Sequence, residues 1–162
     1  MMEREVSWVR FSLTSGITIG AVAVLVTMLE RIEALVGVVS ILRFILLISM
    51  SMYFIRVYRD RYNEGRISGG RAFAMALIMM LCVGVVAMVY TYIKTSGIPP
   101  ATYDEMIVMM KDVYEEQGVN LPDESWDKVV EMIPYASSLM ALLGHVVLGA
   151  MVGAVAAMSI RR

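Results

Sequence analysis

The sequence contains very little of the material from which disulfide frameworks and metal centres are built. Its 162 residues include one cysteine and one histidine. A disulfide needs a second cysteine, and a metal site needs several ligands brought together. We therefore expect no disulfide, no metal site and no bound cofactor, and we interpret Cys82 as a small buried hydrophobic residue.

Charge is also scarce over long parts of the chain. Hydrophobic residues make up 59% of the sequence and gather in four long stretches. A helix needs about 20 mostly apolar residues to cross a bilayer core of about 30 Å, and its backbone groups must be satisfied within the helix. The sequence therefore predicts an all-α integral membrane protein, a single domain over residues 1–162, with four transmembrane helices over residues 9–29, 34–55, 72–93 and 135–160.

The charged residues outside these stretches predict the orientation of the chain. Acidic residues outnumber lysines between Lys94 and Tyr135, whereas the loop between the second and third spans is basic. By the positive-inside rule, the basic loop and both termini lie in the cytoplasm and the acidic segment lies outside. We expect a multi-pass protein of the bacterial cytoplasmic, or inner, membrane. The basic loop either only fixes the topology or also binds anionic lipid headgroups. Its arginines are Arg56, Arg59, Arg61, Arg66 and Arg71.

Apolar residues recur at helical spacing within the acidic outer segment. Met106, Ile107 and Met110 share one face of a helix, with acidic residues between them. This pattern is typical of an amphipathic helix. Gly118 ends this helix, and Pro122 precedes a second one. The sequence therefore predicts an extracytoplasmic amphipathic helical hairpin at residues 99–134, between the third and fourth spans, with helices over residues 102–117 and 123–132.

A sequence motif extends from the basic loop into the third span. Residues 58–73 read YRDRYNEGRISGGRAF, and the span that follows ends in Tyr90-Thr-Tyr92-Ile93. This stretch resembles a cytoplasmic turn in the bacterial four-span membrane protein family catalogued as domain of unknown function 4199, although Gly69 stands where that family has an aromatic residue. The residues that match are Gly65, Ile67, Ser68, Gly70, Ala72 and Phe73, with Ile98, Pro99 and Pro100 near an Ile-x-Pro step.

The resemblance covers most of the chain, because it extends to the Met-rich and Glu-rich helix before the last span. It implies a four-span fold. The family has no assigned activity and no agreed functional residues, so the resemblance implies no catalytic or cofactor-binding residue.

Arg43 and His145 are the two basic side chains that fall well inside predicted spans. An arginine at the centre of a membrane helix costs about 2.5–3.5 kcal/mol on insertion scales, so its presence suggests a function. One interpretation is that the second span begins near Arg43 and the guanidinium extends outward toward Glu30 and Glu33. The other interpretation is a buried site for an anionic headgroup or a partner carboxylate.

Small residues recur every four positions around His145, including Gly149 and Gly153. Such a stripe lets another helix backbone approach closely. We interpret His145 as a packing residue that hydrogen-bonds to a backbone carbonyl or a hydroxyl of a facing helix, for which Ser15 and Thr18 of the first span are candidates. A proton relay would need an acidic residue at the same depth, and no predicted span supplies one.

Two Gly-x-x-x-Gly motifs occur in the predicted spans. The first is formed by Gly16 and Gly20, and the second by Gly149 and Gly153. Both are motifs for close helix packing. Two interpretations are open, because the motifs either pack against each other within one chain or one of them faces another subunit.

No arrangement of catalytic groups is visible, so we do not expect an enzyme, and nucleic-acid binding has no support. The expected function is a non-catalytic membrane scaffold or accessory subunit of an envelope complex, embedded in the lipid bilayer and assembling with itself or with a protein partner. One alternative is a lipid-handling or transporter-like protein that uses Arg43 and His145. Another is a membrane anchor for a cytoplasmic glycosyltransferase-like enzyme. A cavity at mid-depth would favour the lipid-handling or transporter-like function, whereas a dry bundle would favour the scaffold.

Overall fold

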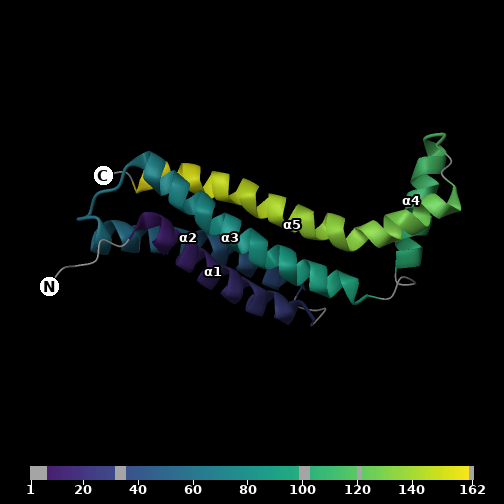
Figure 1. Cartoon of the computed structure of the whole chain (residues 1–162), viewed down its shortest axis with the longest axis horizontal. Coiled ribbons are helices and arrows are strands. Elements are labelled where there is room, and N and C mark those ends of the chain that lie inside the picture. The colour runs from purple at the N-terminus through teal and green to yellow at the C-terminus, as the bar shows by residue number, and fades with distance from the viewer. Residues whose placement is uncertain (1–6, 32–35, 99–102, 120–121, 161–162) are drawn as a thin grey trace.

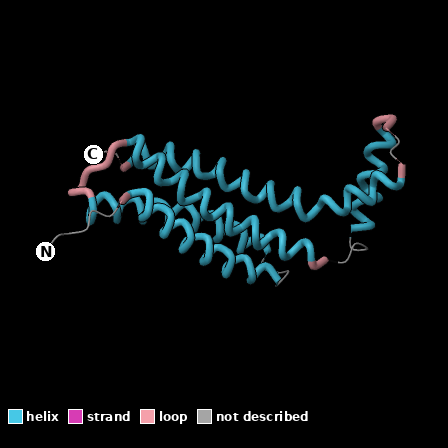
Figure 2. The backbone as a smooth tube through the Cα atoms, in the orientation of Figure 1, coloured by secondary structure: helices cyan, strands magenta, loops and turns pink. Residues whose placement is uncertain are grey.

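The structure is a computed structural model that describes residues 7–31, 36–98, 103–119 and 122–160. Within these ranges the chain folds into helices and connecting turns, with no β-strand (Figure 2). The elements are α1 (Trp8–Thr27), a 3-10 turn η1 (Met28–Arg31), α2 (Val36–Tyr62), α3 (Gly69–Ser96), α4 (Asp104–Glu116) and α5 (Asp123–Ser159).

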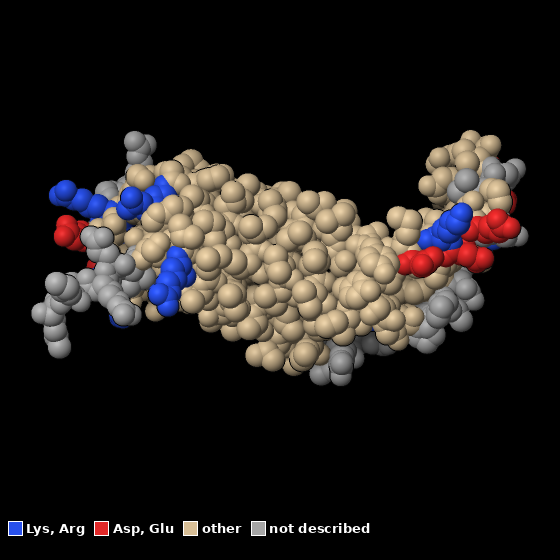
Figure 3. All heavy atoms as spheres, viewed as in Figure 1, with Lys and Arg blue, Asp and Glu red and all other residues tan. Residues whose placement is uncertain are grey.

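Four of these helices, α1, α2, α3 and α5, are long and apolar enough to cross a membrane, which confirms the predicted set of candidate spans. Charged side chains on the face shown in Figure 3 gather at the two ends of the molecule and leave an uncharged band between them. The helices extend beyond the apolar stretches. α2 continues to Tyr62 rather than ending at residue 55, since Arg59 and Arg61 in its last turn interact favourably with the negative end of the helix dipole.

α3 is the central helix of the bundle. It packs most extensively against α5 and, through other residues, against α1, and α1 in turn packs against α2. α2 makes far fewer contacts with α3 and α5. Figure 1 shows α3 and α5 running side by side, with α1 and α2 beneath them. The fully buried residues of α3 that occupy the core are Ala72, Met75, Ala76, Met79 and Met80.

The Gly-x-x-x-Gly motif of α1 packs against α3. A Cβ atom added at Gly16 would lie 2.7 Å from the backbone oxygen of Met79, and one added at Gly20 would lie 3.1 Å from the Cβ atom of Val86. Real Cβ atoms essentially never lie closer than 3.0 Å to such an atom. The absence of a side chain at Gly16 therefore allows the two helices to come this close.

The motif of α5 packs against α3 as well. A Cβ atom added at Gly149 would lie 2.7 Å from the Cβ atom of Met80, and one added at Gly153 would lie 2.8 Å from the ring of Phe73. Neither interpretation drawn from the sequence is therefore correct. The two motifs neither pack against each other nor face another subunit, because α3 lies between them and is the partner of both.

α5 is one continuous helix from Asp123 to Ser159, with Pro134 inside it. This finding corrects the prediction of a separate helix over residues 123–132 followed by a span that begins at residue 135. Proline lacks a backbone N–H and removes one helical hydrogen bond. However, the hydroxyl of Ser137 donates a 2.7 Å hydrogen bond to the carbonyl of Ile133, and hydroxyl groups of this kind allow membrane helices to continue through a proline.

α4 contacts the first turns of α5. The rings of Tyr114 and Trp126 meet edge to face, with their centres 5.7 Å apart, and the ammonium of Lys111 lies 5.8 Å from the centre of the Trp126 ring. Gly118, with a φ of 76°, lets the chain turn away from the end of α4. We refer to α4 together with residues 123–132 of α5 as the α4–α5 hairpin. The predicted starting residue of its first helix, Thr102, lies outside the described residues, and α4 begins at Asp104.

Candidate ligand-binding cavity

A cavity of about 800 Å³ lies between the four candidate spans. α1 and α3 form one side of it, and α2 and α5 form two further walls. α2 and α5 make few contacts with each other, and the lining residues Phe44 of α2 and Met140 of α5 are both exposed. It occupies the half of the bundle away from the arginine-rich turn, because its residues come from the end of α1, the start of α2, the end of α3 and the middle of α5.

The cavity exists because small residues face it from three helices. These residues are Gly20 and Ala23 of α1, Ala87 of α3, and Ala141 and Gly144 of α5. A Cβ atom added at Gly144 would meet no atom within 4 Å. Gly144 therefore borders open space, unlike the glycines of the α3 contact, and a larger side chain at this position would enter the cavity.

Polar side chains line one end of the cavity, and apolar side chains line the rest. Leu47, Val83 and Leu148 supply hydrocarbon surface in the deeper part. None of the described residues that line the cavity is an aspartate or a glutamate, whereas two of them are cations. The cavity is therefore polar at one end and apolar along its length. The side chains at the polar end are Thr27, Ser40, Arg43, Tyr90, Thr91, Lys94 and Thr95.

Arg43 reaches from α2 to the end of α1. Its Nη1 atom donates a 3.3 Å hydrogen bond to the hydroxyl of Thr27, the last residue of α1. The negative end of the α1 dipole favours a cation at this position. The helix begins at Val36, about two turns before Arg43, and the interpretation that the membrane-spanning part of α2 starts near Arg43 stays a prediction. Glu33 and the side chain of Glu30 lie outside the described residues.

His145 lines the same cavity from α5. Its Nδ1 atom lies 2.7 Å from the carbonyl oxygen of Ala141 in the same helix, and because a carbonyl can only accept, Nδ1 is the donor. The predicted hydrogen bond to Ser15 or Thr18 is therefore wrong. The hydroxyl of Thr18 donates instead to the carbonyl of Thr14 in its own helix, and α3 separates α1 from α5.

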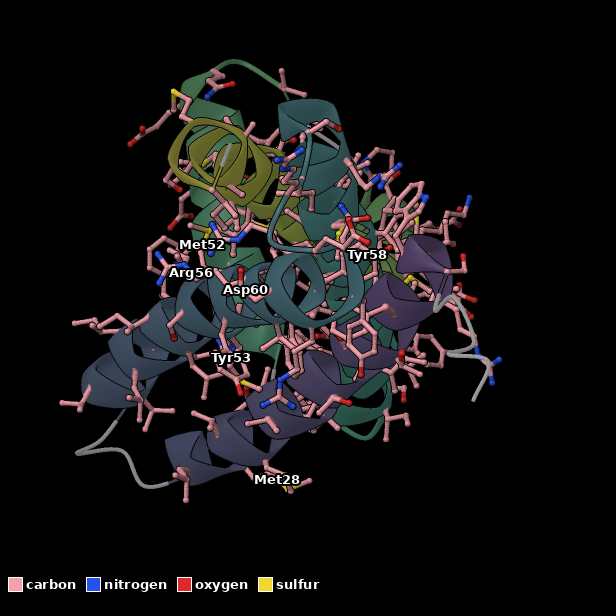
Figure 4. All side chains as sticks on the ribbon, turned by 90° about the vertical axis from the view of Figure 1, so that its left-hand side faces the viewer. Met28, Met52, Tyr53, Arg56, Tyr58 and Asp60 are labelled. Atoms are coloured by element: carbon pink, nitrogen blue, oxygen red, sulfur yellow. The ribbon has the colours of Figure 1, made fainter. Side chains whose placement is uncertain are left out.

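The basic loop lies at the opposite end of the bundle from the polar end of the cavity. Figure 4 looks at this end and labels Arg56, Tyr58 and Asp60 of α2. Tyr58 is buried and its ring packs 5.4 Å from that of Phe11, whereas Arg56 is exposed. Arg59 forms a salt bridge with Asp60, with 2.7 Å between Nε and Oδ1. The structure therefore does not bring the basic loop together with Arg43 and His145. The other exposed arginines of the loop are Arg61, Arg66 and Arg71.

The turn that carries the sequence motif is closed by hydrogen bonds between side chains and backbone. Gly65 has a φ of 75°, a conformation that residues with a side chain rarely adopt. The hydroxyl of Ser68 accepts a 3.3 Å hydrogen bond from the backbone N–H of Arg71 and caps α3. The side-chain amide of Asn63 donates to the carbonyl of Arg66, and its oxygen accepts from the guanidinium of Arg71 at 3.3 Å. The motif therefore stabilises the turn that connects α2 to α3.

The contribution of α3 to the cavity was not predicted from the sequence. Tyr90, Thr91, Lys94 and Thr95 were assigned to the end of a span and the start of the outer segment, yet all four line the cavity. Their spacing of one, four and five positions places them on one face of a helix. A polar stripe at the end of an apolar helix is the signal that identifies this face. Within the described ranges, no group of three or more histidine, cysteine or carboxylate side chains is arranged to hold a metal ion.

Residues 11–162 match the family described as protein of unknown function, DUF4199. The match covers nearly the whole chain, so the chain belongs to this family, as the resemblance of its α2–α3 turn predicted. No curated protein and no solved structure matches the chain.

Proposed function

We propose that this member of the DUF4199 family is a lipid-handling membrane protein that takes an amphiphilic molecule from the bilayer into the cavity between α2 and α5. The observation that carries the proposal is the cavity, which is polar at one end and apolar along the rest. Its volume of about 800 Å³ lies within the range of about 300–1,000 Å³ that is usual for ligand sites. The scaffold function was expected to accompany a bundle without such a cavity.

The surroundings of the cavity suit a hydrocarbon chain. Side chains that border a void lose dispersion contacts on one side, and an acyl chain from the bilayer restores them. The chain can enter between α2 and α5 without crossing water. Phe44 and Met140, which line the cavity, are 50% and 68% exposed and offer an apolar path from the lipid.

The proposal includes an orientation in the bacterial inner membrane. The arginine-rich turn and both termini face the cytoplasm, in agreement with the positive-inside rule. The polar end of the cavity and the α4–α5 hairpin then lie on the extracytoplasmic side. In this orientation, the headgroup of a bound amphiphile sits near the outer interface, while its acyl chain extends toward Leu47 and Leu148.

A scaffold or accessory subunit is a second candidate, because α4 exposes apolar side chains. Val108, Met109 and Val113 are 57%, 65% and 51% exposed. A protein partner or the membrane surface would cover such residues. The glycine motifs give this candidate no support, since they pack inside the chain.

Filling the cavity tests the lipid-handling function. Gly144→Leu adds a side chain at a position that lines the cavity and whose Cβ atom would meet no atom within 4 Å. Gly37→Leu is the matched control, since its Cβ position is equally open but does not line the cavity. After purification in a mild detergent, native mass spectrometry should find lipid bound to the wild type and to Gly37→Leu, and little or none bound to Gly144→Leu. Equal lipid on all three proteins would refute the proposal.

A further inference from the structure

We propose that His145 makes the cavity selective for an amphiphile that carries a hydroxyl group part-way along its acyl chain, and that Nε2 of the imidazole accepts a hydrogen bond from that hydroxyl. This inference rests on the lipid-handling function proposed above. It adds the chemical class of the ligand and the residue that recognises it.

The first argument is which ring nitrogen of His145 carries the proton. Nδ1 lies 2.7 Å from the carbonyl oxygen of Ala141, one turn earlier in the same helix, and a carbonyl can only accept. In a neutral imidazole one nitrogen donates and the other accepts. Nε2 is therefore the acceptor, and none of the residues that the structure describes forms a hydrogen bond with it.

The second argument is the side of α5 from which the ring enters the cavity. His145, Gly149 and Gly153 recur every four residues, which places them on one face of the helix, and the two glycines pack against α3. The Cβ atom of His145 also lies against α3, 3.2 Å from the Cβ position of Gly84. The side chain thus starts on the α3 side of the helix and lines the cavity. The imidazole is therefore available to a molecule inside the cavity.

The third argument is the depth of the ring. The polar side chains that α3 contributes to the cavity begin at Tyr90 and end at Thr95, whereas His145 lies beside Gly84. At about 1.5 Å per residue, the ring lies roughly 9 Å from Tyr90 along the axis of α3, and further from Thr95. Leu148 lines the cavity one turn deeper than His145. An acyl chain that extends from the polar end toward Leu148 therefore passes the ring.

These observations favour a hydroxylated chain over a plain one. Val83 and Leu148, which line the cavity near this depth, are apolar. A plain acyl chain beside the ring would cover Nε2 with methylene groups and leave an acceptor without a partner in apolar surroundings, which is unfavourable. A hydroxyl at this depth would donate to Nε2, and because its oxygen also accepts, it would pair with a protonated ring as well. An ester carbonyl can only accept, so the neutral ring has no use for it.

Three fatty acids test the selectivity: stearic acid, stearic acid with a hydroxyl near the middle of its chain, and stearic acid with a hydroxyl beside its carboxylate. Each is titrated into the delipidated full-length chain in a mild detergent, and occupancy is measured by native mass spectrometry. The wild type should bind the mid-chain hydroxy acid about fivefold more tightly than the other two. This factor corresponds to one hydrogen bond of about 1 kcal/mol.

Substitutions of His145 should change this preference in a graded way. His145→Phe keeps an aromatic ring without an acceptor and should bind the three acids equally. His145→Gln keeps an amide oxygen that accepts and should retain part of the preference. Ser159→Ala is the matched control, because Ser159 also bonds to a carbonyl of its own helix but does not line the cavity, and it should retain the whole preference.

Nitrogen NMR of the imidazole gives a readout that a merely structural role would not change. The chain contains one histidine, so the imidazole signals come from His145. The empty protein should show the proton on Nδ1. The mid-chain hydroxy acid should shift the Nε2 resonance, and stearic acid should not. A proton on Nε2 in the empty protein, or equal shifts with both acids, would overturn the inference.

The outcomes separate the two proposals. If the wild type binds the three acids equally and Gly144→Leu reduces the binding of all three, the lipid-handling function stands and the role of His145 is wrong. If Gly144→Leu leaves their binding unchanged, the lipid-handling function itself is wrong. If the preference for the mid-chain hydroxy acid persists in His145→Phe, another residue recognises the hydroxyl and the assignment to His145 is overturned.

Discussion

Replacing Gly16 by alanine should force α1 away from α3. The added Cβ atom would lie 2.7 Å from the backbone oxygen of Met79, 2.8 Å from the Cβ atom of Cys82 and 2.9 Å from the Cα atom of Met79. Two of these three atoms are backbone atoms in the middle of α3, which move only if the helix moves. Because membrane helices associate through close packing rather than hydrophobic exclusion, the separation would weaken the whole α1–α3 contact.

The expected magnitude follows from two opposing effects. Overpacking a well-packed contact typically costs about 1–3 kcal/mol, and a clash with backbone belongs at the upper end of that range. Alanine regains about 1 kcal/mol of helix propensity relative to glycine, which leaves a net loss of about 2 kcal/mol. For a chain of this size each kcal/mol lowers Tm by about 2–4 °C, so Tm should fall by about 4–8 °C.

The measurement is thermal unfolding followed by circular dichroism in a single detergent. Gly144→Ala is the matched control, because its added methyl group meets no atom within 4 Å and only the gain in helix propensity remains. Its Tm should equal or exceed that of the wild type. If Gly16→Ala and Gly144→Ala have the same Tm, Gly16 does not set the distance between α1 and α3, and the reasoning is refuted.

Three further predictions concern topology, His145 and the cap of α3. Single cysteines at Glu64 and Glu115 should be labelled from opposite sides of the membrane by an impermeant maleimide, and labelling of both from one side would contradict the four-span arrangement. His145→Gln should change Tm by less than about 4 °C, since the hydrogen bond it loses is within its own helix and is worth about 1 kcal/mol; a larger fall would indicate a contact with another helix. Ser68→Ala should lower Tm by about 2–4 °C through the loss of the N-cap, worth about 1 kcal/mol, and hydrogen exchange should increase in the first turn of α3 but not in α5.

The four candidate spans could be predicted because the thickness of the bilayer sets the length of an apolar helix. Positions of single residues depend on tertiary contacts and were predicted less well. The Gly-x-x-x-Gly motifs indicated close approach but not the partner, since the pattern describes only one of two surfaces. The partner surface on α3 is made of residues that carry no such motif. Met79, which lies opposite Gly16, and Met80, which lies opposite Gly149, are two of them.

The cavity could not be predicted from the sequence, although Arg43 and His145 were singled out. Its existence depends on how far α2 stands from α3 and α5, and no local pattern encodes that separation. Lys94 was assigned to the outer segment because it follows the apolar stretch. The helix continues to Ser96, however, and this extra turn brings Lys94 to the same cavity as Arg43. The predicted break between residues 132 and 135 is also wrong, because α5 continues through Pro134, where the hydroxyl of Ser137 bonds to the carbonyl of Ile133.

α5 is longer than a helix needs to be to cross the membrane. At about 1.5 Å per residue, its 37 residues extend over about 55 Å, whereas the hydrocarbon core is about 30 Å thick. The first ten residues of α5 belong to the α4–α5 hairpin, and its middle lines the cavity around Gly144. Its second half packs against α3 at Gly149 and Gly153. Under the proposed lipid-handling function, a partner bound to the hairpin is therefore expected to change the separation of α2 and α5 without contacting the lipid. A cross-link that fixes the hairpin to the end of α3 should accordingly slow the exchange of bound lipid. Unchanged exchange would show that the hairpin and the middle of α5 move independently.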